Sequence, residues 1–239
     1  MKAEIGKSYL RNVSHKGELI NFEYPVVRGT YDAVARAIDK KELNRPTSAQ
    51  TASLVYDAFQ NRNGKYESKI IQILNDDCFW EFTGNLYLPK SREKYNNGVI
   101  IEDNPVISWG SSIRLVMNKK DLVKRLNSGD SSVRFVPFGF TTRNQSIKEL
   151  EKNPYIIARY GEEGAEKIAK IASEYKGSPY LWSFDSVNEE TTKMSQLGLY
   201  RGSGDGLLVD GGGWDSNSDG HAFGVCIPED NKPEGGKTK

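Results

Sequence analysis

The stretch that decides the fold is the tract GLYRGSGDGLLVDGGGWDSNSDGHA at residues 198–222, which leads into the apolar run FGVCI at residues 223–227. Lys, Glu, Gln, Met and Trp make up 51 of the chain's 239 residues. Between positions 198 and 226 they occur once, as Trp214, where about six would be expected. The tract is built instead from Gly, Ser, Asp, Asn, Tyr, Leu and His. In binding loops Tyr supplies rigid contact area, and Ser, Gly and Asn supply adaptable hydrogen bonds. The composition therefore predicts a binding surface here.

The rest of the chain has the composition of an ordinary soluble globular protein, with 37% hydrophobic and 27% charged residues. Its 33 basic and 32 acidic residues leave a net charge of +1, so no basic excess favours a nucleic-acid ligand. No apolar run reaches the roughly 18 residues of a transmembrane helix, so we expect no membrane insertion. The N-terminus, MKAEIGKSYLRNVSHKG, lacks the apolar core of a secretory signal, which favours a cytoplasmic or virion-associated protein.

Hydrophobic periodicity predicts helices in the early and middle parts of the chain. Thr30 precedes an apolar stripe at i, i+3, i+4 and i+7 and is expected to be its N-cap. Thr47 with Gln50 three residues later is the pattern of a capping box. The predicted helices are 31–38, 47–59, 65–75, 117–126, 146–150 and 162–175.

Short apolar runs bounded by turn residues predict the strands, and the aromatic run CFWEFTGNLYL at residues 78–88 is the longest. Helices and strands do not alternate as in a doubly wound fold, so we expect an α+β protein with irregular antiparallel strands and long loops. Residues 1–228 are expected to form one domain, and the Pro/Gly-rich tail 229–239 is expected to be disordered. The predicted strands are 19–27, 78–88, 98–101, 113–117, 133–138, 180–184, 197–201, 207–209 and 223–227.

The four tryptophans fall into two groups. Trp80, Trp109 and Trp182 lie in apolar, strand-like surroundings, which predicts that each packs in the core. Trp214 lies between glycines and an aspartate, with no apolar periodicity around it. We expect Trp214 to be a partly exposed anchor, and a lid over the core is the competing interpretation.

A metal site was sought in the run Asp215-Ser-Asn217-Ser-Asp219-Gly220, which matches the first half of a calcium loop. The EF-hand interpretation fails because position 12 of the loop is Cys226 instead of a bidentate Glu. A different calcium loop, completed by Asp210 or Glu229, stays open. The alternative is a polar turn whose side chains bond their own backbone. No cofactor other than this calcium ion is suggested.

Catalytic motifs are not found. Only His15 and His221 could serve a Ser-His or Cys-His arrangement, and G-x-S-x-G, H-E-x-x-H and P-loop patterns do not occur. The Gly-rich run at residues 202–206 follows a strand without opening a helix, so it lacks the context of a phosphate site. A surface hydrogen-bonding role is therefore predicted for His221. Cys78 and Cys226 form no C-x-x-C pair and are expected to be two buried thiols, with a disulfide between them left open.

The order of features resembles the C-type lectin-like fold and, more narrowly, the variable proteins of diversity-generating retroelements. It comprises the helices at 47–59 and 162–175, the run YLWSF at 180–184, and a loop-rich tract that closes on Ala222-Phe223-Gly224-Val225. In that family the mutagenised region lies at the C-terminus and ends in a strand that often reads GVR or GFR. Gly224-Val225 matches this strand, and Cys226 stands where the family has Arg.

The resemblance implies a rigid scaffold that presents a hypervariable ligand-binding surface at residues 198–225 to a protein or glycan ligand, without catalysis. Mutagenesis of AAY codons in the family cannot produce Lys, Glu, Gln, Met or Trp, which is the depletion found in the tract. Two alternatives remain. One is a calcium-dependent carbohydrate-binding module using Asp215, Asn217 and Asp219. The other is an enzyme of the formylglycine-generating type, which needs a close cysteine pair. The predicted ligand-binding residues are Tyr200, Ser203, Asp205, Leu207, Asp210, Trp214, Asp215, Asn217 and His221.

Overall fold

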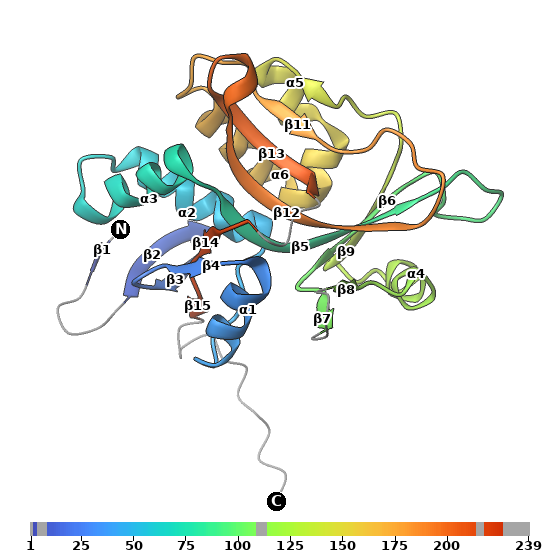
Figure 1. Cartoon of the computed structure of the whole chain (residues 1–239), viewed down its shortest axis with the longest axis horizontal. Coiled ribbons are helices and arrows are strands. Elements are labelled where there is room, and N and C mark those ends of the chain that lie inside the picture. The colour runs from blue at the N-terminus through green and yellow to red at the C-terminus, as the bar shows by residue number, and fades with distance from the viewer. Residues whose placement is uncertain (1, 4–8, 109–113, 214–217, 227–239) are drawn as a thin grey trace, which may run out of the picture.

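A computed structural model describes residues 2–3, 9–108, 114–213 and 218–226. The described chain is an α+β structure in which helices and a large, mostly antiparallel sheet enclose the core (Figure 1). The helices are α1 (Tyr31–Asp39), α2 (Ser48–Gln60), α3 (Lys65–Asp76), α4 (Lys119–Asn127), α5 (Ile147–Lys152), α6 (Pro154–Ala172) and the 3-10 helix η1 (Arg201–Ser203).

The strands of the described residues belong to three sheets. The largest has the order β10-β11-β13-β12-β5-β14-β4, and β6 joins β5 to β9. The others are β1-β2-β3-β15 and the hairpin β7-β8. The bounds are β1 (Lys2–Ala3), β2 (Tyr9–His15), β3 (Glu18–Glu23), β4 (Val27–Gly29), β5 (Phe79–Leu88), β6 (Gly98–Asp103), β7 (Val106–Ser108), β8 (Arg114–Val116), β9 (Val133–Pro137), β10 (Arg143–Asn144), β11 (Tyr180–Trp182), β12 (Thr191–Tyr200), β13 (Gly206–Gly213), β14 (Gly220–Ala222) and β15 (Val225–Cys226).

Strand β5 organises the core, and all ten of its residues are buried. Successive side chains of a strand point to opposite faces, so β5 serves two apolar clusters. Phe79 and Tyr87 pack in the cluster with α2, α3 and α6. Trp80, Phe82 and Leu86 pack in the second cluster with α1 and the β7-β8 hairpin. Its aromatic and β-compatible residues are the reason the sequence identified it as a strand.

The local signals place most helices correctly. Thr47 and Gln50 form the predicted capping box in front of α2. Thr30 occupies the N-cap position of α1, but its hydroxyl donates to the Asp32 carboxylate at 2.5 Å, so no side chain caps that helix.

Helix α6 begins at Pro154, well before the predicted start at residue 162. Asn153 caps it by accepting a hydrogen bond from the Tyr155 N–H at 3.0 Å. Gly161, at φ 76°, interrupts the helical backbone inside α6. The sequence after this break has the acidic residues of a fresh helix N-terminus, which explains the late predicted start.

The C-terminal tract forms longer strands than predicted. β12 and β13 pair antiparallel through the turn at η1, with Gly206 and Gly213 in the ladder and a register shift between Met194 and Gln196. The predicted strand at 223–227 is split in two. Ala222 of β14 pairs with Val27, whereas Val225 of β15 pairs with Phe22 in the smaller sheet. The chain therefore crosses from one sheet to the other at Phe223 and Gly224. Residues 229–239 lie outside the described part of the chain.

Candidate functional site

Four residues from four neighbouring strands form a row on one face of the large sheet. Trp182 of β11 pairs with Asp210 of β13, Asp210 pairs with Gln196 of β12, and Gln196 pairs with Trp80 of β5. Directly opposed residues share a face of a sheet, so their side chains point the same way. The adjacent row of partners, which includes Val209, points to α6 and belongs to the core. The first row lies on the outer face.

A cavity of about 210 Å³ opens over this row. Trp182 and Trp80 stand at its two ends, and Asp210 and Gln196 lie between them. We call this cavity the Trp182 pocket. Its described lining residues are Trp80, Trp182, Met194, Ser195, Gln196, Asp210, Gly213 and Ser218.

Asp210 is the acidic residue of the Trp182 pocket and is 6% exposed. Its carboxylate accepts hydrogen bonds from Gln196 Nε2 at 2.6 Å and from the Gly212 N–H at 2.8 Å. Burial raises the pKa of the Asp210 carboxyl above its usual value, and these hydrogen bonds and the nearby charge of Arg159 oppose that rise.

A buried polar network lies beneath the pocket. Arg159 of α6 and Glu81 of β5 form an ion pair in which both side chains are fully buried. Arg159 also donates to the main-chain carbonyls of Asp210 at 2.9 Å and Gln196 at 3.2 Å, and to Ser48 Oγ at 3.0 Å. The backbones of β12 and β13 are thus fixed by scaffold side chains.

The network continues through β5. Tyr87 donates to the Gly211 carbonyl at 2.9 Å, and Tyr155 donates to Asn85 Oδ1 at 2.7 Å. Asn85 in turn donates to Ser195 Oγ at 2.9 Å. A Cβ atom on Gly211 would collide with the Tyr155 hydroxyl. Some glycines of the tract are therefore required by close packing and not by ligand recognition.

The sequence analysis missed the residues that hold this scaffold. Glu81, Thr83 and Asn85 occupy alternate positions of β5 and face the same side as Phe79 and Tyr87. Polar residues that alternate with aromatic residues in a buried strand indicate a buried polar network, because each buried polar group needs a hydrogen-bonding partner. Nothing local pointed to Arg159 as that partner.

Aromatic rings extend the outer face away from the pocket. Tyr180 lies between Trp182 and Tyr200, with ring centroids 6.0 Å and 4.1 Å away, and both pairs are stacked. Trp182 is 41% exposed, so the prediction that it packs in the core is wrong. Its ring covers Gly212 instead, where an added Cβ would lie 2.8 Å from Trp182 Cδ1. Trp80, at 3% exposed, confirms its prediction, and Trp109 lies outside the described residues.

The structure separates the predicted ligand-binding residues. Asp210 is buried but lines the Trp182 pocket, and Tyr200 is half-buried on the same face. Asp205 is exposed in the turn after η1, which also holds the backbone of Ser203. Leu207 is fully buried, so its assignment to the surface is wrong. The predicted residues outside the described part of the chain are Trp214, Asp215 and Asn217.

Leu207 fails for a reason of register. A shift of one residue along a strand moves a side chain to the opposite face. Leu207 pairs with Leu199 on the face toward the core, whereas Leu208 pairs with Tyr180 and Gly198 on the outer face. Leu208, which is not among the predicted residues, is the half-buried leucine of the outer face.

His221 lies apart from the Trp182 pocket, on β14 opposite Arg28 of β4. Its Nδ1 is 3.5 Å from Asp77 Oδ2, and Arg28 lies within 4 Å of both Asp77 and Asp219. Burial lowers the pKa of His221, and the Asp77 carboxylate opposes this change. In this cluster His221 and Asp77 are partly buried, Arg28 and Asp219 are exposed, and the described hydrogen bonds and ion pairs join no Ser or Cys side chain to His221.

Metal and thiol sites receive no support among the described residues, where no group of three or more His, Cys, Asp or Glu could hold a metal ion. Asp215, Asn217 and Glu229 of the calcium alternative lie outside that part of the chain. Cys78 and Cys226 are not joined by a disulfide and are only partly buried. Burial raises the pKa of the Cys78 thiol to about 12, so this thiol stays protonated and is a poor nucleophile at neutral pH.

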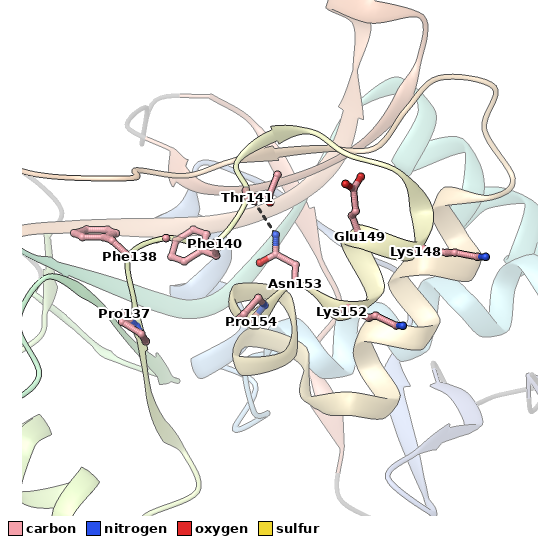
Figure 2. Close-up of a pocket in the computed structure, with 10 residues that line it drawn as sticks. Pro137, Phe138, Phe140, Thr141, Lys148, Glu149, Lys152, Asn153 and Pro154 are labelled. Carbon is pink, nitrogen blue, oxygen red and sulfur yellow. Dashed lines mark hydrogen bonds between the residues drawn. The ribbon is translucent and has the colours of Figure 1, made fainter.

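A second cavity, of about 590 Å³, lies between the loop after β9 and α5 (Figure 2). Phe138 and Phe140 line one side, and the ammonium groups of Lys148 and Lys152 point away from these rings. The buried amide of Asn153 is already bonded, donating to the Thr141 carbonyl at 2.7 Å. The cavity thus lacks the few convergent polar groups that characterise ligand sites, and the Trp182 pocket is the better candidate.

Comparisons with known proteins support the fold. No family model matches the sequence, and no curated protein matches it. A solved structure from Nanoarchaeota, described as accommodating massive sequence variation by the C-type lectin fold, matches with a TM-score of 0.56 and 14% identity. The match covers 84% of this chain and 98% of the other. The protein therefore has the C-type lectin fold, as predicted. Among the described residues, none of the helices has the length and apolarity to cross a bilayer.

Proposed function

We propose that the protein is a recognition protein that binds a ligand through the outer face of β11, β13 and β12, and that it is not an enzyme. The observation that carries this proposal is that the backbones of these strands are held from the core side, while other side chains of the same strands lie on the outer face. Scaffold side chains hold the strands through main-chain carbonyls of Gln196, Asp210 and Gly211. The outer face carries half-buried and exposed side chains, so much of its chemistry can change without touching the core.

We further propose that this face is diversified by a retroelement. The depletion of Lys, Glu, Gln, Met and Trp between positions 198 and 226 supports this origin, because mutated AAY codons cannot encode those residues. The nanoarchaeal structure is described as one that accommodates massive sequence variation on the same fold, which agrees with the proposal. In this reading Asp210 and the tract glycines stay constant, and the exposed residues vary.

The first test measures tolerance of the binding face. A combined variant carries Tyr200→Ser at the end of β12 and Arg201→Ser and Asp205→Asn in the adjoining η1 turn, and AAY codons can mutate to Ser or remain Asn. Each change at an exposed position should alter the free energy of unfolding by about 0.5 kcal/mol or less. Loss of the stacking of Tyr200 on Tyr180 should cost about 0.5–1.5 kcal/mol more, so the variant should keep a cooperative transition with a modestly lower Tm. A matched control replaces Leu197, Leu207 and Val209 by Ser on the inner face and should not fold. Unfolding of the first variant would refute the display role.

The second test addresses diversification directly. The DNA near the gene should contain a near-copy of the coding stretch for residues 198–225 that differs at adenines, next to a reverse transcriptase gene. The differences would list the variable positions. Absence of both features in the complete locus would leave a fixed-ligand protein of the C-type lectin fold.

A second candidate function is calcium-dependent carbohydrate binding, and the D-x-N-x-D-G pattern of residues 215–220 favours it. Asp219 lies 3.6 Å from the guanidinium of Arg28 in the structure, so calcium would compete with this contact. A ligand that binds only the native state raises Tm with its concentration. A rise in Tm with millimolar calcium that disappears in Asp215→Asn would support this function, and no shift would dismiss it.

A further inference from the structure

We propose that the Trp182 pocket binds a single cationic side chain, the ammonium of Lys or the guanidinium of Arg, projected by a protein ligand. This inference rests on the proposed function, because it names the chemistry that the binding face recognises at its centre.

The acidic lining of the Trp182 pocket favours a cationic ligand. Asp210 is the only ionisable residue among the described residues that line the pocket. The nearest buried cation, Arg159, forms its ion pair with Glu81 and reaches Asp210 only at the main-chain carbonyl. Among the described residues, no cationic side chain is therefore hydrogen-bonded to the Asp210 carboxylate. Electrostatic attraction is stronger in such a shielded site than in water, so an incoming cation would be held tightly.

The second argument is the hydrogen-bonding capacity that remains. The Gln196 amide nitrogen already donates to Asp210, and the Gly212 N–H donates to the other carboxylate oxygen. Ser195 Oγ accepts from Asn85 and is almost fully buried. The Asp210 carboxylate and the side-chain carbonyl oxygen of Gln196 place acceptor atoms at the centre of the row. Lys and Arg are donor-only side chains, which is the complementary set.

The third argument is the shape and lining of the pocket. Indole faces attract cations through their quadrupole, and Trp is the strongest of the aromatic side chains in this respect. Trp182 is 41% exposed at one end of the row, and Trp80 lies at the other. The volume of about 210 Å³ lies below the range of about 300–1,000 Å³ for drug-sized ligand pockets. It suits one extended side chain whose methylenes can contact Met194.

The experiment uses the full chain and four small probes followed by NMR of the Trp indole N–H signals. The cationic probes are Nα-acetyl-arginine amide and Nα-acetyl-lysine amide. Nα-acetyl-citrulline amide is the neutral shape match for the first, and methyl glucoside tests for a sugar site. We expect saturable binding of the cationic probes, weakened by salt, and affinity for the citrulline probe lower by about tenfold or more. Equal binding of arginine and citrulline probes, preferential binding of the sugar, or no saturable binding of either cation would overturn the proposal.

Variants assign the binding to the pocket. Asp210→Asn should lower the affinity for the arginine probe by about tenfold or more. Asp205→Asn makes an equal charge change at an exposed position outside the pocket and should alter this affinity less than about twofold. Trp182→Leu provides an independent test should Asp210→Asn fail to fold, and it should also weaken the cationic probes. Unchanged binding in Trp182→Leu, or in a folded Asp210→Asn, would overturn the proposal.

The experiments distinguish failure of the cation site from failure of the proposed display function. Tolerance of the outer-face substitutions together with failure of the cationic probes would defeat the cation site alone. Binding of the probes together with unfolding of the outer-face variant would defeat the display role and leave the cation site standing.

Discussion

Arg159 of α6 donates a hydrogen bond to the main-chain carbonyl of Asp210, 2.9 Å away, while the Asp210 side chain lines the Trp182 pocket. The backbone of Asp210 is therefore held by the scaffold, while its side chain belongs to the proposed binding face. The same division holds at Gln196, whose carbonyl also accepts from Arg159 and whose amide donates to Asp210. When the backbone of a face is held from the core side, the side chains on its outer side can be exchanged without changing the fold.

The buried ion pair should be essential for stability. Arg159→Met leaves the Glu81 carboxylate buried without its cation, and breaking such a pair costs about 3–5 kcal/mol of the free energy of unfolding. Urea denaturation measures this cost. Arg62→Met is the matched control, because the pair of Arg62 with Glu174 is largely solvent-exposed and should contribute about 1 kcal/mol or less. Similar losses in the two variants would contradict the scaffold role of Arg159.

Adjacent leucines should differ sharply. Leu207→Ala empties a fully buried position and should cost about 2–5 kcal/mol. Leu208→Ala removes a half-buried side chain from the outer face and should cost clearly less. Thermal unfolding of both variants tests the register of β13 directly. If Leu208→Ala were the more damaging change, the outer face would be assigned to the wrong residues.

The two tryptophans of the row should also differ. Trp80→Ala removes a side chain that is 3% exposed and stacked edge-on against Tyr31, and should cost about 3–5 kcal/mol. Trp182→Ala should cost much less, since 41% of this residue remains in contact with solvent. Chemical denaturation followed by far-UV circular dichroism measures both, without relying on tryptophan fluorescence. Equal losses of stability in the two variants would show that Trp182 packs in the core as Trp80 does.

Stability should fall as the solution is acidified below the ordinary histidine pKa. Burial, with help from Lys16 and Lys167, lowers the pKa of His15 from 6.5 to about 4. The unfolded chain then binds more protons than the folded chain between these two values, so folding stability decreases as pH falls from about 6.5 to about 4. The Nδ1 atom of His15 lies 3.0 Å from Ser53 Oγ, so the substitution His15→Gln keeps a polar side chain beside the Ser53 hydroxyl.

Melting temperatures across that pH range give the measurement. The slope for His15→Gln should be shallower than for the wild type. His221→Gln is the comparison variant, because the pKa of His221 is also lowered by burial but is opposed by Asp77. An unchanged slope in His15→Gln would show that His15 titrates normally in the folded protein.

Local sequence signals were sufficient where neighbours along the chain decide the structure. The capping box of Thr47 and Gln50 identified the start of α2 because both partners lie within one turn. The acidic residues at 162 and 163 likewise identified the second helical segment of α6, which starts after the non-helical Gly161. The first segment of α6, which begins at Pro154 behind the Asn153 cap, was not predicted.

The sequence by itself determined the α+β class and the long buried strand at β5, and it predicted a binding tract near the C-terminus. These follow from composition and from periodicity, which are properties of neighbouring residues. The tertiary structure alone decided that Leu207 is buried and Leu208 is not, that Trp182 is exposed, and that Asp210 lies between two tryptophans. An alternating strand has two faces, and the sequence does not say which one meets the helices. That choice depends on pairing among β11, β13, β12 and β5, and on a charge on α6 that matches Glu81 more than 70 residues earlier in the chain.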